Sequence, residues 1–239
     1  MSLRSLLKQS EALRGLVKDW RRFRQRPMHA RSRKVSAGYL AAHTTRKLQI
    51  GAGHNPLPGW LCTDIAPVHP GIAFLDATRP FPFPDSSFDV ISSEHMIEHI
   101  AYEQGQFMLR ECRRVLKPGG RIRVATPDLQ VLLALNTSRR AALPQRYLRW
   151  ITERFLPGRP CHPVFVINNA FRNWGHQFLY DAAILQAALE HNGFVAVTRQ
   201  APGQSADAAL RGLEVHGEHI GDEELNAFET MVFEAVCAK

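Results

Sequence analysis

Leu48-Gln49-Ile50-Gly51-Ala52-Gly53 is the stretch that decides how this chain of 239 residues folds. Its apolar start predicts a short buried strand, and its two glycines predict a tight turn directly after that strand. Asp64 and Asp76 follow at the ends of the next two predicted strands. Glycines let a backbone approach a ligand where a Cβ would clash, and carboxylates accept hydrogen bonds from hydroxyl and amino groups. This arrangement suits a nucleoside with a hydroxylated ribose and an adenine.

Strands and helices alternate along the rest of the chain. We expect strands at 47–50, 60–64, 71–75, 89–92, 121–125, 194–199 and 230–236, and helices at 102–116, 145–155 and 181–191. Such alternation predicts an α/β fold with a doubly wound, mostly parallel sheet. Ligands of these sheets bind at the carboxyl ends of the strands, which is where the glycine turn and both aspartates fall.

Three further segments follow the glycine turn along the chain, namely 81–91 (FPFPDSSFDVI), 93–99 (SEHMIEH) and 113–120 (RRVLKPGG). Together with 48–53 they resemble the motifs of class I S-adenosylmethionine-dependent methyltransferases over about residues 47–130. The resemblance is strongest to small members found among bacterial polysaccharide biosynthesis enzymes. In those, a Pro-Gly-Trp element precedes the ribose carboxylate, as Pro58-Gly59-Trp60 does here.

The resemblance implies a domain organisation as well as a fold. It implies a seven-stranded sheet in which the last two strands form an antiparallel hairpin at the edge. The methyltransferase domain would span 47–239, with an insertion at 127–178 that serves as a substrate lid. Residues 1–46 would form a basic arm, made of an amphipathic helix over about 3–24 and an exposed linker over 25–36.

The resemblance also implies S-adenosylmethionine as cofactor and assigns residues to it. The expected cofactor residues are Gly51, Ala52, Gly53, Asp64, Ile65, Asp76, Ala77, Ser93 and Glu94. Asp64 would bind the ribose hydroxyls, and Asp76 with the Ala77 backbone would face the adenine. The alternatives are that the glycines form an ordinary turn and that the two aspartates are solvated or act as local caps. Gln49 departs from the family, because many relatives carry an acid at that place.

The expected reaction is transfer of the methyl group to a sugar hydroxyl, which requires a base. His176 and His95 are the candidate bases. A cluster of Asn169, Arg172, Trp174 and His99 is expected to bind the acceptor, since a sugar stacks on an indole and takes hydrogen bonds from amides and imidazoles. The alternatives are a buried aromatic turn for the cluster and a packing role for His99.

Two other classes of site share parts of these patterns. A dinucleotide site needs a third glycine where Pro56 stands and a carboxylate about 20 residues on, but Asp64 follows Gly51 by only 13. His95-Met96-Ile97-Glu98-His99 also spells the H-x-x-E-H pattern of one class of zinc peptidases. That class requires a long helix and a third ligand, whereas this segment directly follows a predicted strand. We therefore predict no metal site.

Charge and composition limit the partners. Residues 1–47 hold 13 Lys and Arg against two acids, a net charge of +11. Because the whole chain carries +8, residues 48–239 carry a net charge of −3. Nucleic acid is therefore a disfavoured partner, and a small-molecule or glycan acceptor is favoured. The helix at 3–24 either docks on the domain or contacts anionic membrane. Four separated cysteines predict a cytoplasmic protein. A catalytically silent cofactor-binding module with the same fold is the alternative function.

Overall fold

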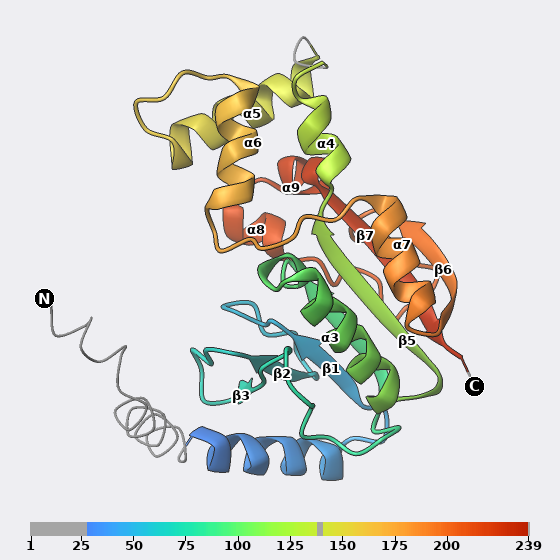
Figure 1. The fold of residues 1–239 in the computed structure, drawn as a ribbon. Coiled ribbons are helices and arrows are strands. Elements are labelled where there is room, and N and C mark those ends of the chain that lie inside the picture. Colours follow the sequence, from blue (N-terminus) through green and yellow to red (C-terminus); the bar gives the residue numbers. More distant parts are fainter. Residues whose placement is uncertain (1–27, 138–140, 239) are drawn as a thin grey trace, which may run out of the picture.

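A seven-stranded mixed sheet forms the centre of the computed structural model, which describes residues 28–137 and 141–238 (Figure 1). The strands are β1 Lys47–Ile50, β2 Leu61–Asp64, β3 Ala73–Phe74, β4 Phe88–Glu94, β5 Leu116–Pro127, β6 Phe194–Gln200 and β7 Thr230–Cys237. Their order across the sheet is β3-β2-β1-β4-β5-β7-β6. Only β7 runs antiparallel to its neighbours, β5 and β6. The predicted seven-stranded, mostly parallel sheet with an antiparallel pair at one edge is confirmed.

Seven labelled helices follow β4 in the described part of the chain. They are α3 Tyr102–Val115, α4 Leu129–Ala134, α5 Ala142–Phe155, α6 Pro163–Arg172, α7 Ala182–His191, α8 His216–Ile220 and α9 Glu223–Glu229, with a 3₁₀ turn η1 at Ile97–His99. The sequence analysis predicted α3, α5 and α7 and missed the other four. Three of the missed helices begin at side-chain caps that were available in the sequence, namely Asp128, His162 and Asp222.

The main hydrophobic core lies between the sheet and helices α3 and α7. Alternate residues of each strand point into it, such as Ile122 and Val124 of β5. On α3, Met108 and Cys112 lie one turn apart and are fully buried. This packing fixes the strand ends, and with them the loops that follow each strand.

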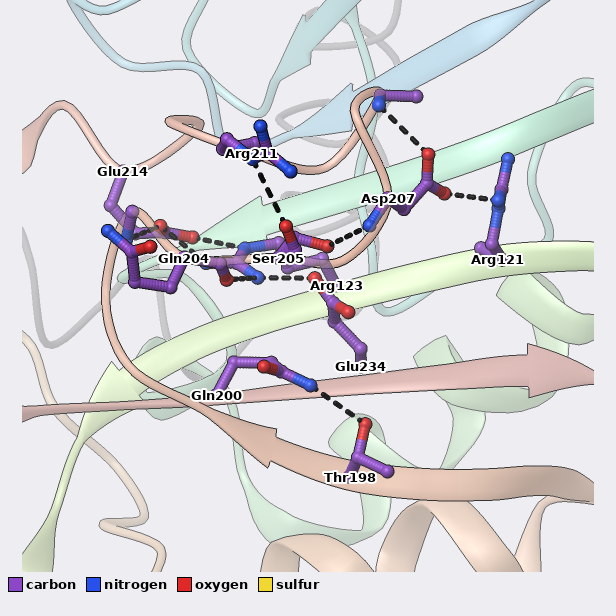
Figure 2. A network of polar contacts seen from close by, with 12 residues as sticks. Arg121, Arg123, Thr198, Gln200, Gln204, Ser205, Asp207, Arg211, Glu214 and Glu234 are labelled. Carbon is purple, nitrogen blue, oxygen red and sulfur yellow. Dashed lines mark hydrogen bonds and ion pairs between the residues drawn. The ribbon is translucent and has the colours of Figure 1, made fainter.

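The opposite face of the sheet is covered differently. The three connections between β1 and β4, all of which the structure describes, contain no helix. Instead Trp60 from the first connection packs with Leu210 from the segment between β6 and α8. Beside them, Arg123 of β5 forms ion pairs with Glu214 and Glu234 under the same segment (Figure 2). The segment 201–215 therefore covers this face of the sheet in place of a helix.

A helix over residues 28–42 packs against the β2–β3 side of the domain (Figure 1). The backbone N–H of Phe74 donates to the Ser32 hydroxyl at 2.8 Å. Tyr39 donates to the carbonyl of Gly59 and accepts from the N–H of Lys47. The predicted linker at 25–36 is thus wrong for 28–36, because this segment has apolar and hydroxyl side chains at helical spacing. The predicted helix at 3–24 lies outside the described residues.

Other expectations concern the cysteines and the membrane. All four cysteines are free thiols, and three of them are buried. Within the described ranges, none of the helices combines the length and the apolarity that crossing a bilayer requires.

Candidate functional site

A cavity of about 450 Å³ opens at the carboxyl ends of the central strands. Its floor is made by the glycine turn after β1 and by the segment after β4. Its roof is made by α5, by the end of α6 and by the loop to Trp174 and His176. The described part of residues 127–178 therefore lies over the same strand ends at which a ligand is expected from the sequence.

The glycine turn provides a backbone surface without side chains. Gly51 has φ +77°, and a Cβ there would come within 2.5 Å of the Met96 side chain. Gly53 has φ +49°, and the place of its missing Cβ is open for at least 4 Å. This turn fits the close approach of a cofactor such as S-adenosylmethionine. Gln49 holds the turn in place, because its amide bonds the backbone of Asn55 and Leu57.

Asp64 lies against the glycine turn. Its Oδ2 accepts the N–H of Gly53 at 2.9 Å, and its Oδ1 accepts the N–H of Ala66 at 2.7 Å. Each carboxylate oxygen retains a lone pair for a further donor. The tertiary structure thus brings Asp64 and Gly53 together, as a ribose site beside the turn requires.

Asp76, which we expected to face the adenine, lies away from the cavity of the glycine turn. Its carboxylate accepts from the backbone and hydroxyl of Thr78 and pairs with Arg79. It lines a second cavity, between the 28–42 helix and residues 74–83, and not the cavity of the glycine turn. Ile65 is 63% exposed and is also outside the main cavity. Ala77 is buried and likewise does not line it. A role of these three residues in binding adenine therefore stays a prediction.

Glu94 and His95 end β4 at the cavity. The carboxylate of Glu94 accepts the N–H groups of Val215 and His216, and burial raises its pKa. His95 has φ +45°, and its Nδ1 lies 3.2 Å from Glu98 Oε1. Although burial alone lowers the pKa of His95, its carboxylate neighbour raises that pKa to about 9. His95 is thus an imidazolium at neutral pH, and this disfavours it as a base.

Two buried polar groups lie next to His95. Glu98 is fully buried, and its Oε2 accepts the Thr126 hydroxyl at 3.0 Å. Burial alone would raise the pKa of Glu98, but the adjacent His95 lowers it. The Ser93 hydroxyl is buried and has no hydrogen-bond partner among the described residues. Ser93 does not line the cavity, whereas Glu94, His95 and Glu98 do.

His99 and His176 meet at one corner of the cavity. Their ring centroids are 4.9 Å apart in an edge-on arrangement. Nδ1 of His176 lies 2.8 Å from the carbonyl oxygen of Ala170, which can only accept. The neutral ring therefore has its proton on Nδ1 and a lone pair on Nε2. Burial lowers the pKa of His176 below its usual range, so this ring is neutral at physiological pH.

Aromatic side chains surround this corner. Trp174 packs edge-on against Phe155 of α5 at 5.1 Å and lies 5.7 Å from His176. Trp174 is 41% exposed, and Trp150 of α5 lines the cavity with it. Gly175, with φ +81°, allows the close approach of His99, whose Nδ1 lies 3.6 Å from the place a Cβ would take. The Trp-Gly-His element thus places an indole face and an imidazole at the same opening.

Asn169 and Arg172, which we expected to bind the acceptor, do not line the cavity. Asn169 is buried and accepts from the side chain of Asn173 at the end of α6. Arg172 is exposed at the end of the same helix. The reason is helical geometry, since Ala170 faces the cavity and a residue two positions on points away from it. Binding of the acceptor by these two residues therefore stays a prediction.

The structure adds cavity residues that the sequence analysis did not single out. Tyr147 of α5 donates to Glu229, and burial raises the pKa of that carboxyl. His216 lies beside His95 with ring centroids 4.4 Å apart. Both Glu229 and His216 come from the C-terminal quarter of the chain. His216 belongs to a polar run in the sequence that could border the substrate or be a solvated connection, whereas no motif marks Glu229. The start of α8 brings His216 to the end of β4, and the end of α9 brings Glu229 to Tyr147 of α5.

Comparisons with known proteins match part of this chain to methyltransferases. Residues 65–124 match a family described as a methyltransferase domain. A probable S-adenosylmethionine-dependent methyltransferase of Mycolicibacterium smegmatis is 49% identical over 47 residues. That match covers 20% of this chain and 18% of the length of the relative.

Solved structures of low similarity have also been found. A SAM-dependent methyltransferase from Archaeoglobus fulgidus is 17% identical, with coverage of 89% of this chain and 94% of the other and a TM-score of 0.47. A possible histamine N-methyltransferase from Thermotoga maritima is also 17% identical, with coverage of 92% and 95% and a TM-score of 0.45. Likeness at this level carries no information about the acceptor. The family match over residues 65–124, the relative, the strand order and the glycine turn agree with the class I S-adenosylmethionine-dependent methyltransferases that the sequence resembles.

Proposed function

We propose that this protein transfers a methyl group from S-adenosylmethionine to a hydroxyl of a sugar-like acceptor. One observation carries the proposal. A single cavity extends from the glycine turn at Gly51 to the aromatic corner of Trp150 and Trp174, and His176 lines it beside Trp174. A donor at one end and an acceptor at the other would then meet beside an imidazole, and alignment supplies much of the rate of such a transfer.

The cofactor part of the proposal rests on the floor of the cavity. Gly51, Ala52 and Gly53 would line the methionine part, and Asp64, which bonds the turn but does not itself line the cavity, would accept from the ribose hydroxyls. Glu94 and the buried Ser93 would lie below the reactive methyl. The cofactor supplies a methyl group already activated by a sulfonium, so the protein's task is alignment and proton removal.

His176 is the residue that we propose to act on the acceptor. The acceptor oxygen forms a bond to the methyl carbon while the carbon–sulfur bond breaks and its electron pair stays on sulfur. The hydroxyl proton passes to Nε2 of His176, whose other nitrogen donates to Ala170. The backbone bond keeps the ring orientation fixed, so that Nε2 retains its lone pair for this proton.

The acceptor class rests on Trp174 and on the resemblance to polysaccharide biosynthesis enzymes. An indole face stacks on the C–H face of a sugar, and His99 can bond a neighbouring hydroxyl. We further propose that the acceptor is a glycan or a lipid-linked precursor handled in the cytoplasm. Residues 127–178 would then serve as the lid over it, and the basic residues 1–24 would contact the anionic inner face of the membrane.

A second candidate function is a cofactor-binding module without catalysis. Gln49 favours it, because many relatives carry an acid there and the Gln49 amide is already used in holding the glycine turn. Such a module would bind the cofactor and would act through a partner subunit.

Calorimetric titration with S-adenosylhomocysteine, followed by an acceptor panel with methyl-labelled cofactor, tests both candidates. Micromolar binding and label transfer to a glycan hydroxyl would support the enzyme. Binding without transfer to any acceptor, cell extract included, would favour the silent module. Transfer only to nitrogen or to protein would refute the sugar acceptor, and no binding to the folded protein would refute both.

Deletion of residues 1–24 tests the membrane contact. Loss of binding to anionic vesicles with an unchanged melting temperature would support it. A large fall in melting temperature with no change in vesicle binding would contradict it, and would favour a helix docked on the domain.

A further inference from the structure

Three metal-ligating side chains meet in the cavity beside the aromatic corner. One ligand atom each of Glu98, His99 and His176 lies within 4.8 Å of the other two. Glu98 and His99 come from the turn after β4, and His176 comes from the loop after α6. Glu98 and His99 are adjacent in sequence, whereas His176 lies 77 residues beyond His99 and reaches them only because the loop after α6 packs over the strand ends.

We propose that Glu98, His99 and His176 bind a divalent first-row transition-metal ion. Two observations independent of their proximity support this. Glu98 is 0% exposed and lines the cavity, and its Oε1, which pairs with His95 Nδ1 at 3.2 Å, accepts no hydrogen bond from the described residues. His176 donates Nδ1–H to a backbone carbonyl, which is the usual outer contact of a histidine that ligates metal through its other nitrogen.

The donor set selects the kind of ion. Two imidazoles and one carboxylate suit Zn²⁺ or Fe²⁺, whereas Ca²⁺ and Mg²⁺ prefer ligands that are all oxygen. Ligand atoms about 2.0–2.2 Å from a shared ion stand within about 4 Å of one another. Closure around an ion therefore requires a shift of about 1 Å, which rotation of the partly exposed His99 ring can supply while His176 keeps its bond to Ala170. Three protein ligands leave a coordination position open toward the cavity.

This set differs from the H-x-x-E-H site of zinc peptidases. In that pattern His95 and His99 would share the ion. Here both nitrogens of His95 are engaged, Nδ1 with Glu98 and Nε2 with the Thr230 hydroxyl at 3.1 Å. His95 therefore lies outside the proposed ligands, and His176 takes its place.

The inference rests on the proposed function and changes one step of it. Nε2 of His176 would ligate the ion, and the acceptor hydroxyl would occupy the open position. A bound divalent ion lowers the pKa of its hydroxyl ligand, so the proton would pass to water as the bond from oxygen to methyl forms. His176 would then act on the acceptor through the ion.

The test uses untagged full-length protein, because a histidine tag would itself bind metal. The protein is freed of metal with a chelator and titrated with Zn²⁺ and, separately, with Co²⁺ as a spectroscopic probe. The variants are His99→Ala, His176→Ala and Glu98→Gln, which keeps the shape of the buried carboxylate. His191→Ala is the matched control, because His191 is an exposed histidine at the end of α7.

We expect one ion per chain at micromolar concentration or tighter, with visible Co²⁺ absorption. Each ligand variant should weaken binding at least tenfold, and His191→Ala should bind as the wild type does. Absence of stoichiometric binding, or binding that survives His176→Ala, would overturn the inference. Titration with S-adenosylhomocysteine in chelator separates the two proposals. Cofactor binding without ion binding refutes only the metal site, and ion binding without cofactor binding refutes the proposed function.

Discussion

Arg123 and Glu214 form a two-pronged ion pair inside the protein, with N–O distances of 2.6 and 2.7 Å and side chains that are 1% and 3% exposed (Figure 2). Arg123 also pairs with Glu234, its direct cross-strand neighbour on β7, and donates to the carbonyl of Gln204. One guanidinium thus ties β5, β7 and the segment 201–215 together. That segment leads directly to the N–H groups of Val215 and His216, which bind Glu94 at the cavity.

Replacing Arg123 with Leu should therefore destabilise the protein strongly. It leaves the carboxylates of Glu214 and Glu234 without their cation inside the protein, which typically costs about 3–5 kcal/mol. Urea denaturation measures this cost, and amide exchange at Val215 and His216 should also become faster. Arg121→Leu is the control, because Arg121 is 43% exposed and its pair with Asp207 is worth about 1 kcal/mol or less. Equal losses in the two variants would contradict the tying role of Arg123.

Asp64→Asn should weaken binding of S-adenosylhomocysteine. The change keeps the side-chain shape and replaces one acceptor oxygen by a donor, so we expect a loss of about 1–3 kcal/mol of binding free energy. Calorimetry measures it. Asp76→Asn in the same experiment tests the adenine prediction, since Asp76 lies in the second cavity. Unchanged affinity in Asp64→Asn would remove Asp64 from the ribose site.

His176→Ala should lower turnover and leave cofactor affinity nearly unchanged. Loss of proton removal at the acceptor typically slows a reaction by about 10²-fold or more. Single-turnover assays with labelled cofactor measure the rate, and calorimetry measures the affinity. A full rate in the variant would mean that another group activates the acceptor.

Trp174→Ala should raise the KM for a sugar acceptor. Loss of stacking on an indole costs about 1 kcal/mol, or roughly fivefold in KM. Phe171→Ala is the control, because Phe171 is a similarly exposed aromatic of α6 that does not line this cavity. Equal effects of the two changes would argue against a specific platform at Trp174.

Asp89→Asn should reduce stability in a manner that depends on pH. Burial alone would raise the pKa of Asp89, but the N–H of Arg46 and the ammonium of Lys117 outweigh it, so that the pKa is lowered in the folded state. The stabilisation is then present above the unfolded pKa of about 3.9 and is lost as the pH falls through the lower folded pKa. At neutral pH we expect a loss of about 1 kcal/mol, since both partners are about one-third exposed.

Urea denaturation of wild type and variant between pH 8 and pH 3 measures this dependence. The stability difference should be constant down to about pH 5 and should shrink below about pH 4. Asp85→Asn is the control, because the Asp85 side chain is 77% exposed and its pair with Arg114 should contribute little. A difference that stays constant to pH 3 would show that charge is not the cause.

Much of the fold could be predicted from local patterns. Apolar runs between Gly, Pro and Asp residues marked all seven strands, and helical spacing marked α3, α5 and α7. The missed helices α4, α8 and α9 have only five to seven residues each, too short for a periodic pattern. The exposed-linker prediction failed at 28–36 because charged residues there alternate with Ser32 and Val35, which pack on the sheet.

The sequence by itself determined the strands, the glycine turn and the approach of Asp64 to it, because these depend on neighbours along the chain and on the general rule that parallel strands end at one edge. Only the tertiary structure decided the partners of Arg123, the pairing of His99 with His176 and the exclusion of Arg172 from the cavity. Glu214 lies 91 residues from Arg123, and His176 lies 77 residues beyond His99. Contacts over such distances are set by how the inserted and C-terminal segments pack against the sheet, and no local pattern encodes that packing.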